Sequence, residues 1–187
     1  MTDWDDAVAQ MQVCRRCPLA ESRRHVVVYR GGSRPSVLFV GEAPGRSEDE
    51  TGLPFVGRAG KILDRAIAEL GLREEDWGVT NEFMCRPPGN VYDRHAASAC
   101  RPWLDLKIRL LGPRLLVPLG AHPLRALLPG TGPILTVAGT LHASERGPVF
   151  PLLHPAATVR RIAYAERWNH DVAQLRELLP RFLRGEH

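Results

Sequence analysis

The stretch that decides the fold reads Ser36-Val37-Leu38-Phe39-Val40-Gly41-Glu42-Ala43-Pro44-Gly45. Its first half is an uninterrupted apolar run, which predicts a strand buried on both faces, as in a parallel sheet. Its second half holds two glycines and a proline, which predicts a tight turn. Such a turn exposes backbone N–H groups and lets a ligand approach the backbone closely. The Gly-Lys-Ser/Thr of a Walker loop does not follow it.

Outward from this stretch, strand and helix patterns alternate along the chain. Further strands are predicted at 79–83, 115–119 and 149–153. Helices are predicted at 62–70, ended by Gly71, then at 96–111, 121–128 and 162–179, the last ended by Pro180. The alternation predicts an α/β fold, with helices on both faces of a mostly parallel sheet. The length of 187 residues fits one domain, residues 1–187.

Ligands bind beyond the carboxyl ends of the strands in such sheets. The segments that lie there are Gly41–Gly45, Asn81 and His154-Pro155-Ala156, and we expect them to converge on one crevice. Phe55 lies on a loop ahead of the first helix, where it is either a core anchor or a platform for a planar ligand. Taken singly, each of these residues also has an ordinary structural role, as a turn, a cap or a loop anchor.

The composition narrows the class of protein. Apolar residues make up 44% of the chain, which is typical of a globular protein, and no apolar run approaches the roughly 18 residues of a membrane span. The acidic start, Asp3 to Asp6, has no apolar segment of a secretory signal, so a cytoplasmic location is expected. The net charge of +4 comes almost entirely from arginine and permits a polyanionic partner without requiring one.

Four cysteines are present, namely Cys14, Cys17, Cys85 and Cys100. In a cytoplasmic chain they point to metal binding or catalysis rather than to disulfides. Cys14 and Cys17 can bind one metal centre together, whereas Cys85 and Cys100 are too far apart in sequence for a second zinc knuckle. The uneven spacing fits an iron–sulfur cluster at least as well as zinc, and the cysteines alone leave the two metals open.

Taken together, the motifs resemble those of the iron–sulfur (family 4) uracil-DNA glycosylases, in the same order along nearly the whole chain. The matching segments are Cys14-Arg15-Arg16-Cys17-Pro18-Leu19, Gly41–Gly45, Glu48-Asp49, Gly52–Gly60 around Phe55, Asn81, Cys85–Asn90, Cys100, Leu119-Gly120-Ala121 and His154-Pro155-Ala156-Ala157. The resemblance implies a four-stranded, mostly parallel sheet in a three-layer α/β/α domain. It also implies a monofunctional enzyme of base excision repair, which hydrolyses the N-glycosidic bond of uracil in DNA and leaves an abasic site.

The resemblance also assigns roles to individual residues. Cys14, Cys17, Cys85 and Cys100 would bind a 4Fe–4S cluster that holds loops near DNA. Phe55 would stack on a uracil flipped out of the helix, and Asn81 would bind its O4 and N3–H edge, which rejects cytosine. His154 would donate to uracil O2. Glu42 would place the attacking water, within the substrate-binding turn of Gly41, Ala43, Pro44 and Gly45.

Two departures from the family pattern bear on DNA contacts. The segment after His154 should wedge into the minor groove, where the family usually has two leucines and this chain has Thr158-Val159. Val159 would then be a short plug, and Arg160 and Arg161 would contact phosphates. The second departure is Val91-Tyr92-Asp93-Arg94-His95, where many relatives have a proline-containing stretch. His95 with Arg94 faintly resembles the loop of a subgroup that becomes covalently trapped on uracil DNA, although the basic run of that subgroup is missing.

Other functions remain open on the residues alone. One is a non-catalytic or covalently uracil-trapping DNA-binding metalloprotein, which would need the cysteines but not the set Glu42, Phe55, Asn81 and His154. A different hydrolase or nucleotidase would need an acidic metal cluster or a Gly-x-Ser-x-Gly turn, and cluster-based electron transfer would need a further cofactor motif. Uracil-containing DNA is the expected partner, a sliding clamp is a further candidate, and the chain is expected to be monomeric.

Overall fold

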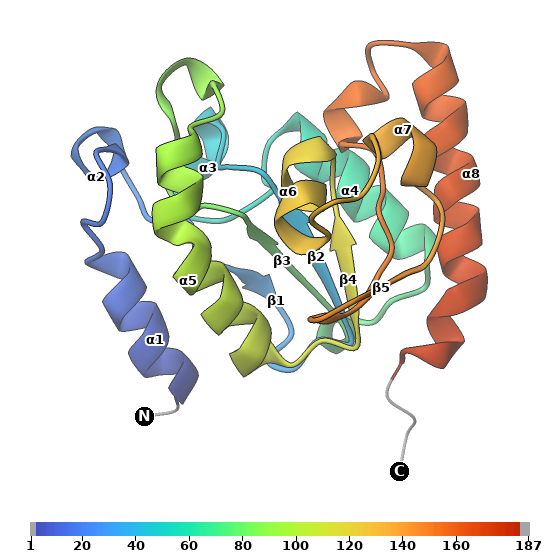
Figure 1. The fold of residues 1–187 in the computed structure, drawn as a ribbon, viewed down its shortest axis with the longest axis horizontal. Coiled ribbons are helices and arrows are strands. Elements are labelled where there is room, and N and C mark those ends of the chain that lie inside the picture. Colours follow the sequence, from blue (N-terminus) through green and yellow to red (C-terminus); the bar gives the residue numbers. More distant parts are fainter. Residues whose placement is uncertain (1–2, 184–187) are drawn as a thin grey trace.

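A computed structural model describes residues 3–183 of the protein (Figure 1). Its centre is a six-stranded sheet with the strand order β1-β3-β2-β4-β6-β5. The strands are β1 (Arg30–Gly31), β2 (Val37–Gly41), β3 (Trp77–Asn81), β4 (Leu115–Pro118), β5 (His142–Ser144) and β6 (Gly147–Val149). The apolar run Val37 to Val40 therefore lies in β2, in the middle of the sheet, as expected of a strand that is buried on both faces.

Four of the strands form a parallel core, in the order β3-β2-β4-β6. The expected four-stranded parallel sheet is thus present, but the sheet is wider than expected. β1 pairs antiparallel with β3 at one edge, and β5 pairs antiparallel with β6 at the other. These edge strands are two and three residues long, too short to carry a periodic apolar pattern that sequence analysis could detect.

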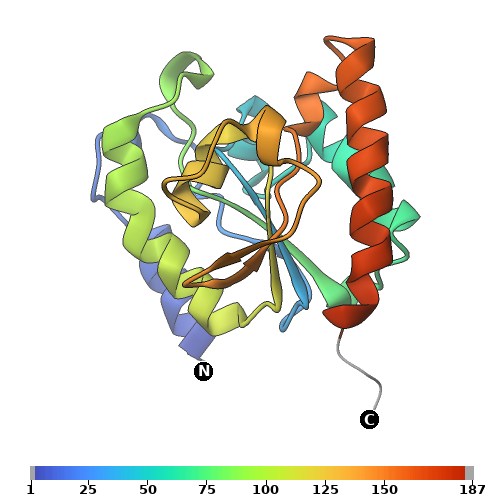
Figure 2. The ribbon, with the colours of Figure 1, turned by 45° about the vertical axis from the view of Figure 1, so that its right-hand side comes forward.

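Alternate residues of β2 point to opposite faces of the sheet and bury two separate cores. Val37 and Phe39 pack with α4 (Arg58–Glu69) and α8 (Ile162–Leu178). Leu38 and Val40 pack with α5 (Arg94–Leu111) and α6 (Ala121–Leu127). Figure 2 shows the sheet between these two helical layers, which confirms the three-layer α/β/α prediction.

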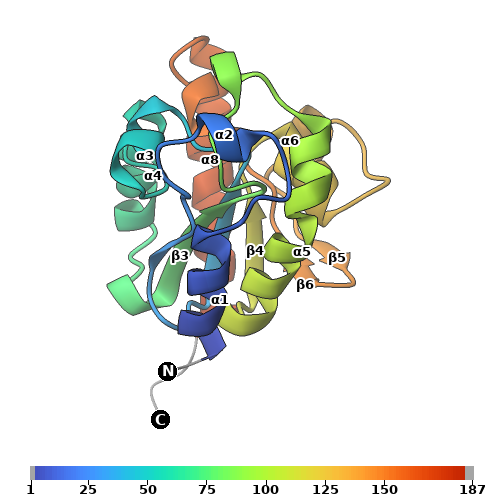
Figure 3. The same cartoon turned by 90° about the vertical axis from the view of Figure 1, so that its left-hand side faces the viewer.

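A third apolar cluster lies beside the sheet and contains the cysteines. It joins α1 (Asp3–Gln12) to α5 through Met11, Trp103 and their neighbours, with α2 (Leu19–Ser22) close by. Figure 3 shows α1, α2 and α5 together on this side of the molecule. No helix in residues 3–183 is long and apolar enough to cross a membrane.

The remaining elements are short and lie mostly in the loops. They are α3 (Arg46–Thr51), α7 (Ile134–Val137), η1 (Glu74–Asp76), η2 (Pro88–Asn90), η3 (Pro155–Ala157) and η4 (Leu179–Arg181). Two predicted strands are shifted by two or more residues in the structure, whereas the other two differ by a single residue at an end. The strand predicted at 79–83 ends at Asn81, and the one predicted at 149–153 ends at Val149, after which a single bridge between Leu119 and Leu152 keeps the chain beside β4.

Candidate active site

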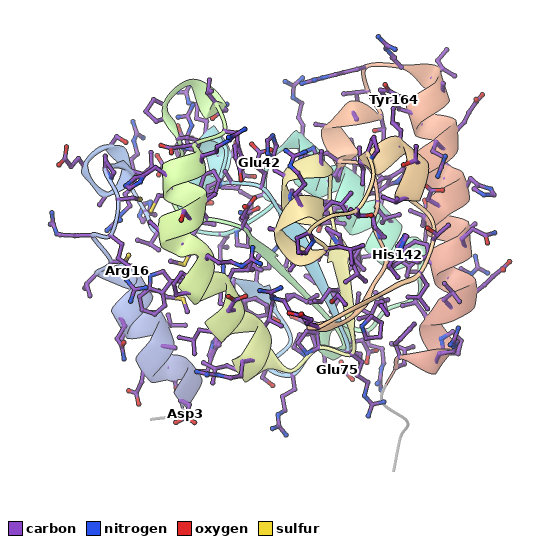
Figure 4. The ribbon with its side chains drawn as sticks, viewed as in Figure 1. Asp3, Arg16, Glu42, Glu75, His142 and Tyr164 are labelled. Carbon is purple, nitrogen blue, oxygen red and sulfur yellow. The ribbon has the colours of Figure 1, made fainter. Side chains whose placement is uncertain are left out.

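The strand-end segments converge on one cavity at the carboxyl edge of the sheet, as expected. Its volume is about 480 Å³. The lining includes Glu42, Ala43, Pro44, Gly45, Phe55, Asn81, His154, Ala156 and Arg160. Gly41 is buried directly beneath, because it is the last residue of β2. Figure 4 shows Glu42 at this edge, between α5 and α6. Residues more than 100 positions apart in sequence therefore line a single site.

The Gly41–Gly45 turn is tied to the opposite wall of the cavity by the carboxylate of Glu48. One oxygen, Oε2, accepts the backbone N–H of Gly45 at 3.1 Å. The other, Oε1, accepts the N–H groups of Val56 and Gly57 at 2.9 and 2.8 Å. A charged acceptor makes these bonds stronger than neutral ones. Glu48 thus fixes the distance between the turn and the loop that carries Phe55.

Phe55 is held in the left-handed backbone region, at φ 55°, and only 6% of it is exposed. This conformation costs a non-glycine residue about 1–2 kcal/mol, so the surroundings must hold it. Arg30 donates to the carbonyl of Phe55 at 3.2 Å and also pairs with Asp64 at 2.7 Å. Gly60 packs on the same carbonyl, because a Cβ there would lie 1.8 Å from it. The ring is thereby placed on the cavity wall, 6.2 Å from the ring of His154.

Asn81 is the last residue of β3 and is 1% exposed, yet neither polar atom of its side chain has a partner in residues 3–183. Leaving a buried amide unpaired costs about 1–3 kcal/mol for each group, and such groups need an explanation. The backbone around it is firmly held, since the buried Lys107 donates to Thr80 Oγ1 at 2.5 Å and to the Asn81 carbonyl at 3.1 Å. The amide therefore faces the cavity with a free donor and a free acceptor.

His154 caps the short helix η3, and its Nδ1 accepts the backbone N–H of Ala156 at 3.2 Å. Burial, together with a smaller contribution from the nearby Arg160, lowers the pKa of the imidazole to about 4. The ring is therefore neutral at pH 7. Because Nδ1 is an acceptor, the single proton lies on Nε2. His154 offers one neutral N–H donor to the cavity.

Glu42 follows β2 and has a half-buried carboxyl group. Burial raises its pKa above the ordinary value, and the positive charge of Arg125 partly offsets this. Its Oε2 lies 3.8 Å from Nε2 of His122. His122 and Arg125 both lie on α6, which begins just after β4, so the strand-end rule that identified Glu42 also applied to them. Neither residue was predicted from the sequence to belong to the site.

The four cysteines lie in one apolar cluster and form no disulfides. Hydrogen-bond donors reach two of them from side chains, because Trp103 Nε1 donates to Cys14 Sγ at 3.3 Å and Arg23 Nη1 donates to Cys85 Sγ at 3.4 Å. A zinc ion would draw its sulfur ligands to about 2.3 Å from one point. In residues 3–183, however, no three His, Cys, Asp or Glu side chains are close enough together to hold one metal ion. Four cysteine thiols in one cluster match the number of ligands that a 4Fe–4S cluster uses.

The predicted DNA-binding residues follow η3 at the mouth of the cavity. Arg160 and Arg161 are exposed, and Val159 and Ile162 are large apolar residues with 74% and 79% exposure. His95 does not join the site. It is exposed in an adjoining hollow, lined by Val91, Tyr92 and His122, that meets the first cavity at Pro87.

Comparison with known proteins gives a consistent result. A model of the uracil DNA glycosylase superfamily matches residues 29–173. A type-4 uracil-DNA glycosylase of Pyrobaculum aerophilum is 38% identical over 169 residues, which cover 86% of this chain and 86% of that protein. The type-4 enzyme of Archaeoglobus fulgidus is 35% identical over 188 residues, covering 95% and 94%. The type-4 enzyme of Sulfurisphaera tokodaii is 35% identical over 175 residues, which cover 88% of this chain and 80% of that protein. The family model and these relatives each match most of the chain. The chain therefore belongs to the uracil-DNA glycosylase superfamily, within the type-4 group.

Proposed function

We propose that this chain excises uracil from DNA by hydrolysing the N-glycosidic bond and leaving an abasic site. The observation that carries the proposal is the buried, unpaired amide of Asn81 beside Phe55 and His154. Uracil presents an acceptor at O4 and a donor at N3–H, which would satisfy both polar atoms of the amide. Cytosine presents the opposite pattern on this edge, so a buried amide would be left mispaired and would reject it.

The other side chains of the cavity supply binding and charge stabilisation. A base in a duplex must first be flipped out, and Phe55 would then stack on its ring. As the C1′–N1 bond breaks, its electron pair leaves on the uracil. The N–H at Nε2 of His154 would donate to uracil O2 and stabilise that negative charge. A neutral donor suits this role because it gives up no proton.

Glu42 would complete the hydrolysis from the other side of the sugar. Its carboxylate accepts a hydrogen bond from a water held by the Gly41–Gly45 turn and favours the positive charge that develops on the sugar. As the oxygen of that water bonds to C1′, Glu42 takes the released proton. One water is consumed, and the products are the uracil anion and an abasic sugar. No lysine lines the cavity, so a Schiff-base step is not part of the proposal.

We further propose that Cys14, Cys17, Cys85 and Cys100 would hold a 4Fe–4S cluster. Such a cluster, when bound, would supply a rigid link and no step of the hydrolysis. It would join the segment after α1 to the loop that begins at Cys85 and to α5. That loop reaches the cavity through Pro87 and Asn90, so the cysteines would fix one wall of the site.

On the DNA side, the exposed Val159 would fill the gap that the flipped base leaves, and Arg160 and Arg161 would hold the phosphates. Residues 1–187 would act as one domain, in which Cys14/Cys17 and Cys85/Cys100 form the cluster-binding region. The protein would be a monomer. A cytoplasmic location agrees with four reduced cysteines. A sliding clamp stays a predicted partner. Covalent trapping through His95 is not favoured, because His95 lies outside the cavity that holds Asn81 and His154.

The test uses purified protein and a labelled oligonucleotide with one uracil, as a single strand and as a duplex. Alkali-dependent strand breaks in the wild type that fall sharply in His154→Ala would support a monofunctional glycosylase. A slower band that resists denaturant would point to trapping instead. No breaks on either substrate would refute uracil excision. Brown colour with absorbance at about 400 nm, and iron and sulfide by chemical analysis, would test the cluster separately.

A further inference from the structure

A second carboxyl group lies beside Glu42, at the end of the neighbouring strand. The register of β2 and β3 pairs Gly41 with Asn81, so Glu42 and Glu82 follow at matching positions. Hydrogen bonding continues past the strands, because Glu82 donates its backbone N–H to the Gly41 carbonyl at 2.8 Å and Phe83 donates to the Glu42 carbonyl at 3.2 Å. Like charges on neighbouring strands repel each other. The two side chains are therefore coupled.

Glu82 is poorly placed to carry a negative charge. It is 5% exposed, and in the described part of the chain its Oε2 is buried without a hydrogen-bond partner. Its Oε1 accepts the hydroxyl of Tyr92 at 3.0 Å, and the structure gives it no ion pair. A buried carboxylate without a paired cation is costly, and such a group keeps its proton instead.

A second path joins the two carboxyl groups through aromatic side chains. The ring of Tyr92 stacks on the ring of His122, with centroids 3.6 Å apart and an interplanar angle of 18°. Arg125 donates to Nδ1 of His122 at 2.8 Å, so Nδ1 is an acceptor and the proton of the neutral ring lies on Nε2. That nitrogen is the one that faces Glu42 at 3.8 Å. Glu82, Tyr92, His122 and Glu42 thus form one connected group that runs from the cavity to the adjoining hollow.

We propose that Glu82 is a positioning residue that holds a proton beside Glu42, so that the two side chains together carry one negative charge in the working enzyme. The inference rests on the proposed function, in which Glu42 must be a carboxylate when the water attacks. A second charge on Glu82 would repel that carboxylate and also the uracil anion as it forms. A proton on Glu82 removes both repulsions while Glu42 stays ionised.

The electrostatic surroundings of Glu82 agree with this division of charge. The pKa of Glu82 is raised to about 7. Burial is the main cause and the charge of Glu42 adds to it, while the Tyr92 hydroxyl, Arg101 and Arg125 partly offset the rise. Glu42 has the more exposed carboxyl group and ionises first. Lys107 on α5 donates to the carbonyl of Asn81, the residue before Glu82, and burial lowers its pKa to about 8. Loss of the Glu82 proton should therefore reduce activity as the pH rises above about 7.

The activity test is a single-turnover excision profile from about pH 5 to about pH 9. The wild type should lose rate above about pH 7, and Glu82→Gln, which stays neutral, should lose this decline. Tyr92→Phe should move the decline to higher pH, because the hydroxyl that stabilises the ionised form is gone. Glu166→Gln, an exposed carboxyl group on α8, is the matched control and should behave as the wild type. A decline unchanged in Glu82→Gln would overturn the proposal and would point to Lys107.

A second measurement follows the proton itself, without activity. Infrared difference spectra between about pH 5.5 and about pH 8.5 should show a carboxylic-acid carbonyl band that disappears in the wild type and is absent from Glu82→Gln. Identical spectra for the two proteins would overturn the proposal. If the wild type excised no uracil at any pH, the proposed function would fail, and the infrared band would still decide whether Glu82 holds a proton.

Discussion

Gly41 is paired with Asn81 on the neighbouring strand, and a Cβ at Gly41 would be 2.5 Å from Asn81 Oδ1 and 2.5 Å from the ring of Phe55. Contacts this short do not occur, so any side chain here must displace the amide, the ring or both. We predict that Gly41→Ala lowers uracil excision by at least about 10²-fold, because displacement of a catalytic group by 1 Å can have this effect. Single-turnover rates with saturating protein would measure it.

The control for this substitution is Gly132→Ala. Gly132 lies outside the cavity, and the atom closest to a Cβ there is the hydroxyl of Thr136, at the end of a side chain that can rotate. It should leave the excision rate unchanged. Equal rates for Gly41→Ala and the wild type would show that Asn81 and Phe55 do not need their observed positions.

His154 should contribute through its neutral N–H donor. We predict that His154→Ala lowers the excision rate by about 10²–10³-fold, the usual effect of removing such a donor. His154→Gln should retain part of the activity, because its amide N–H has a similar reach. The measurement is the single-turnover rate on single-stranded uracil DNA. Equal rates for the alanine variant and the wild type would remove His154 from the mechanism.

The pKa of His154 has a separate consequence for stability. In the folded protein the pKa is about 4, and in the unfolded chain it returns to about 6.5. Between these two pKa values the unfolded chain binds a proton that the folded protein does not. The contribution of His154 to the free energy of unfolding is therefore fully present above about pH 6.5 and is lost as the pH falls towards 4. Thermal unfolding should therefore show a smaller fall in midpoint between pH 7 and about pH 4.5 for His154→Gln than for the wild type.

Much of the fold could be predicted from the sequence, because its centre consists of long apolar patterns. Val37 to Val40 are buried on both faces, and α5 and α8 each exceed 15 residues, so their periodicity is clear. The edge strands β1 and β5 could not be predicted in this way. They are short, and their extended conformation depends on pairing with β3 and β6 and not on a local preference of their residues.

The sequence was sufficient to predict which residues form the site, but not the contacts that hold them in place. The strand-end rule identified Glu42, Asn81 and His154, which do share the cavity. It did not show that Glu48 bridges the two walls or that Arg30 holds Phe55, because these contacts join loops whose relative positions depend on the whole fold. Glu82 lies within the strand predicted at 79–83, and the sequence does not show that its carboxyl group is buried beside Glu42.

Glu48 links the two walls of the cavity, and its loss should loosen both. Glu48→Gln replaces one charged acceptor by an amide NH₂, so at least one of its three backbone hydrogen bonds is lost. Each bond to a charged group contributes about 1.5–3 kcal/mol. We predict a fall in the unfolding midpoint of several degrees and a clear loss of excision. Glu50→Gln, an exposed partner of Arg46 on the same helix, should change neither.

Arg23 should protect the proposed cluster through its hydrogen bond to Cys85. A donor at a thiolate sulfur raises the reduction potential and the affinity of a metal site, and its loss typically costs about 10–100-fold in affinity. We predict that Arg23→Gln lowers the potential and speeds the loss of absorbance at about 400 nm in air. Arg15→Gln is the control, because Arg15 is exposed next to Cys14. Equal decay of the two variants would mean that the Arg23 contact has no effect on the cluster.

Arg160 and Arg161 should govern the salt dependence of DNA binding rather than the chemistry. Both are exposed beside the mouth of the cavity, and residues 3–183 give neither of them a carboxylate partner. Each phosphate contact adds about 0.7 to the slope of log affinity against log salt on single strands and about 0.9 on duplexes. We predict that the double variant Arg160→Gln/Arg161→Gln reduces the slope by about 1.4 on single strands, with little sequence preference. Arg181→Gln, in η4 beyond the C-terminal end of α8, should leave the slope unchanged. An unchanged slope in the double variant would mean that the DNA backbone does not contact Arg160 and Arg161.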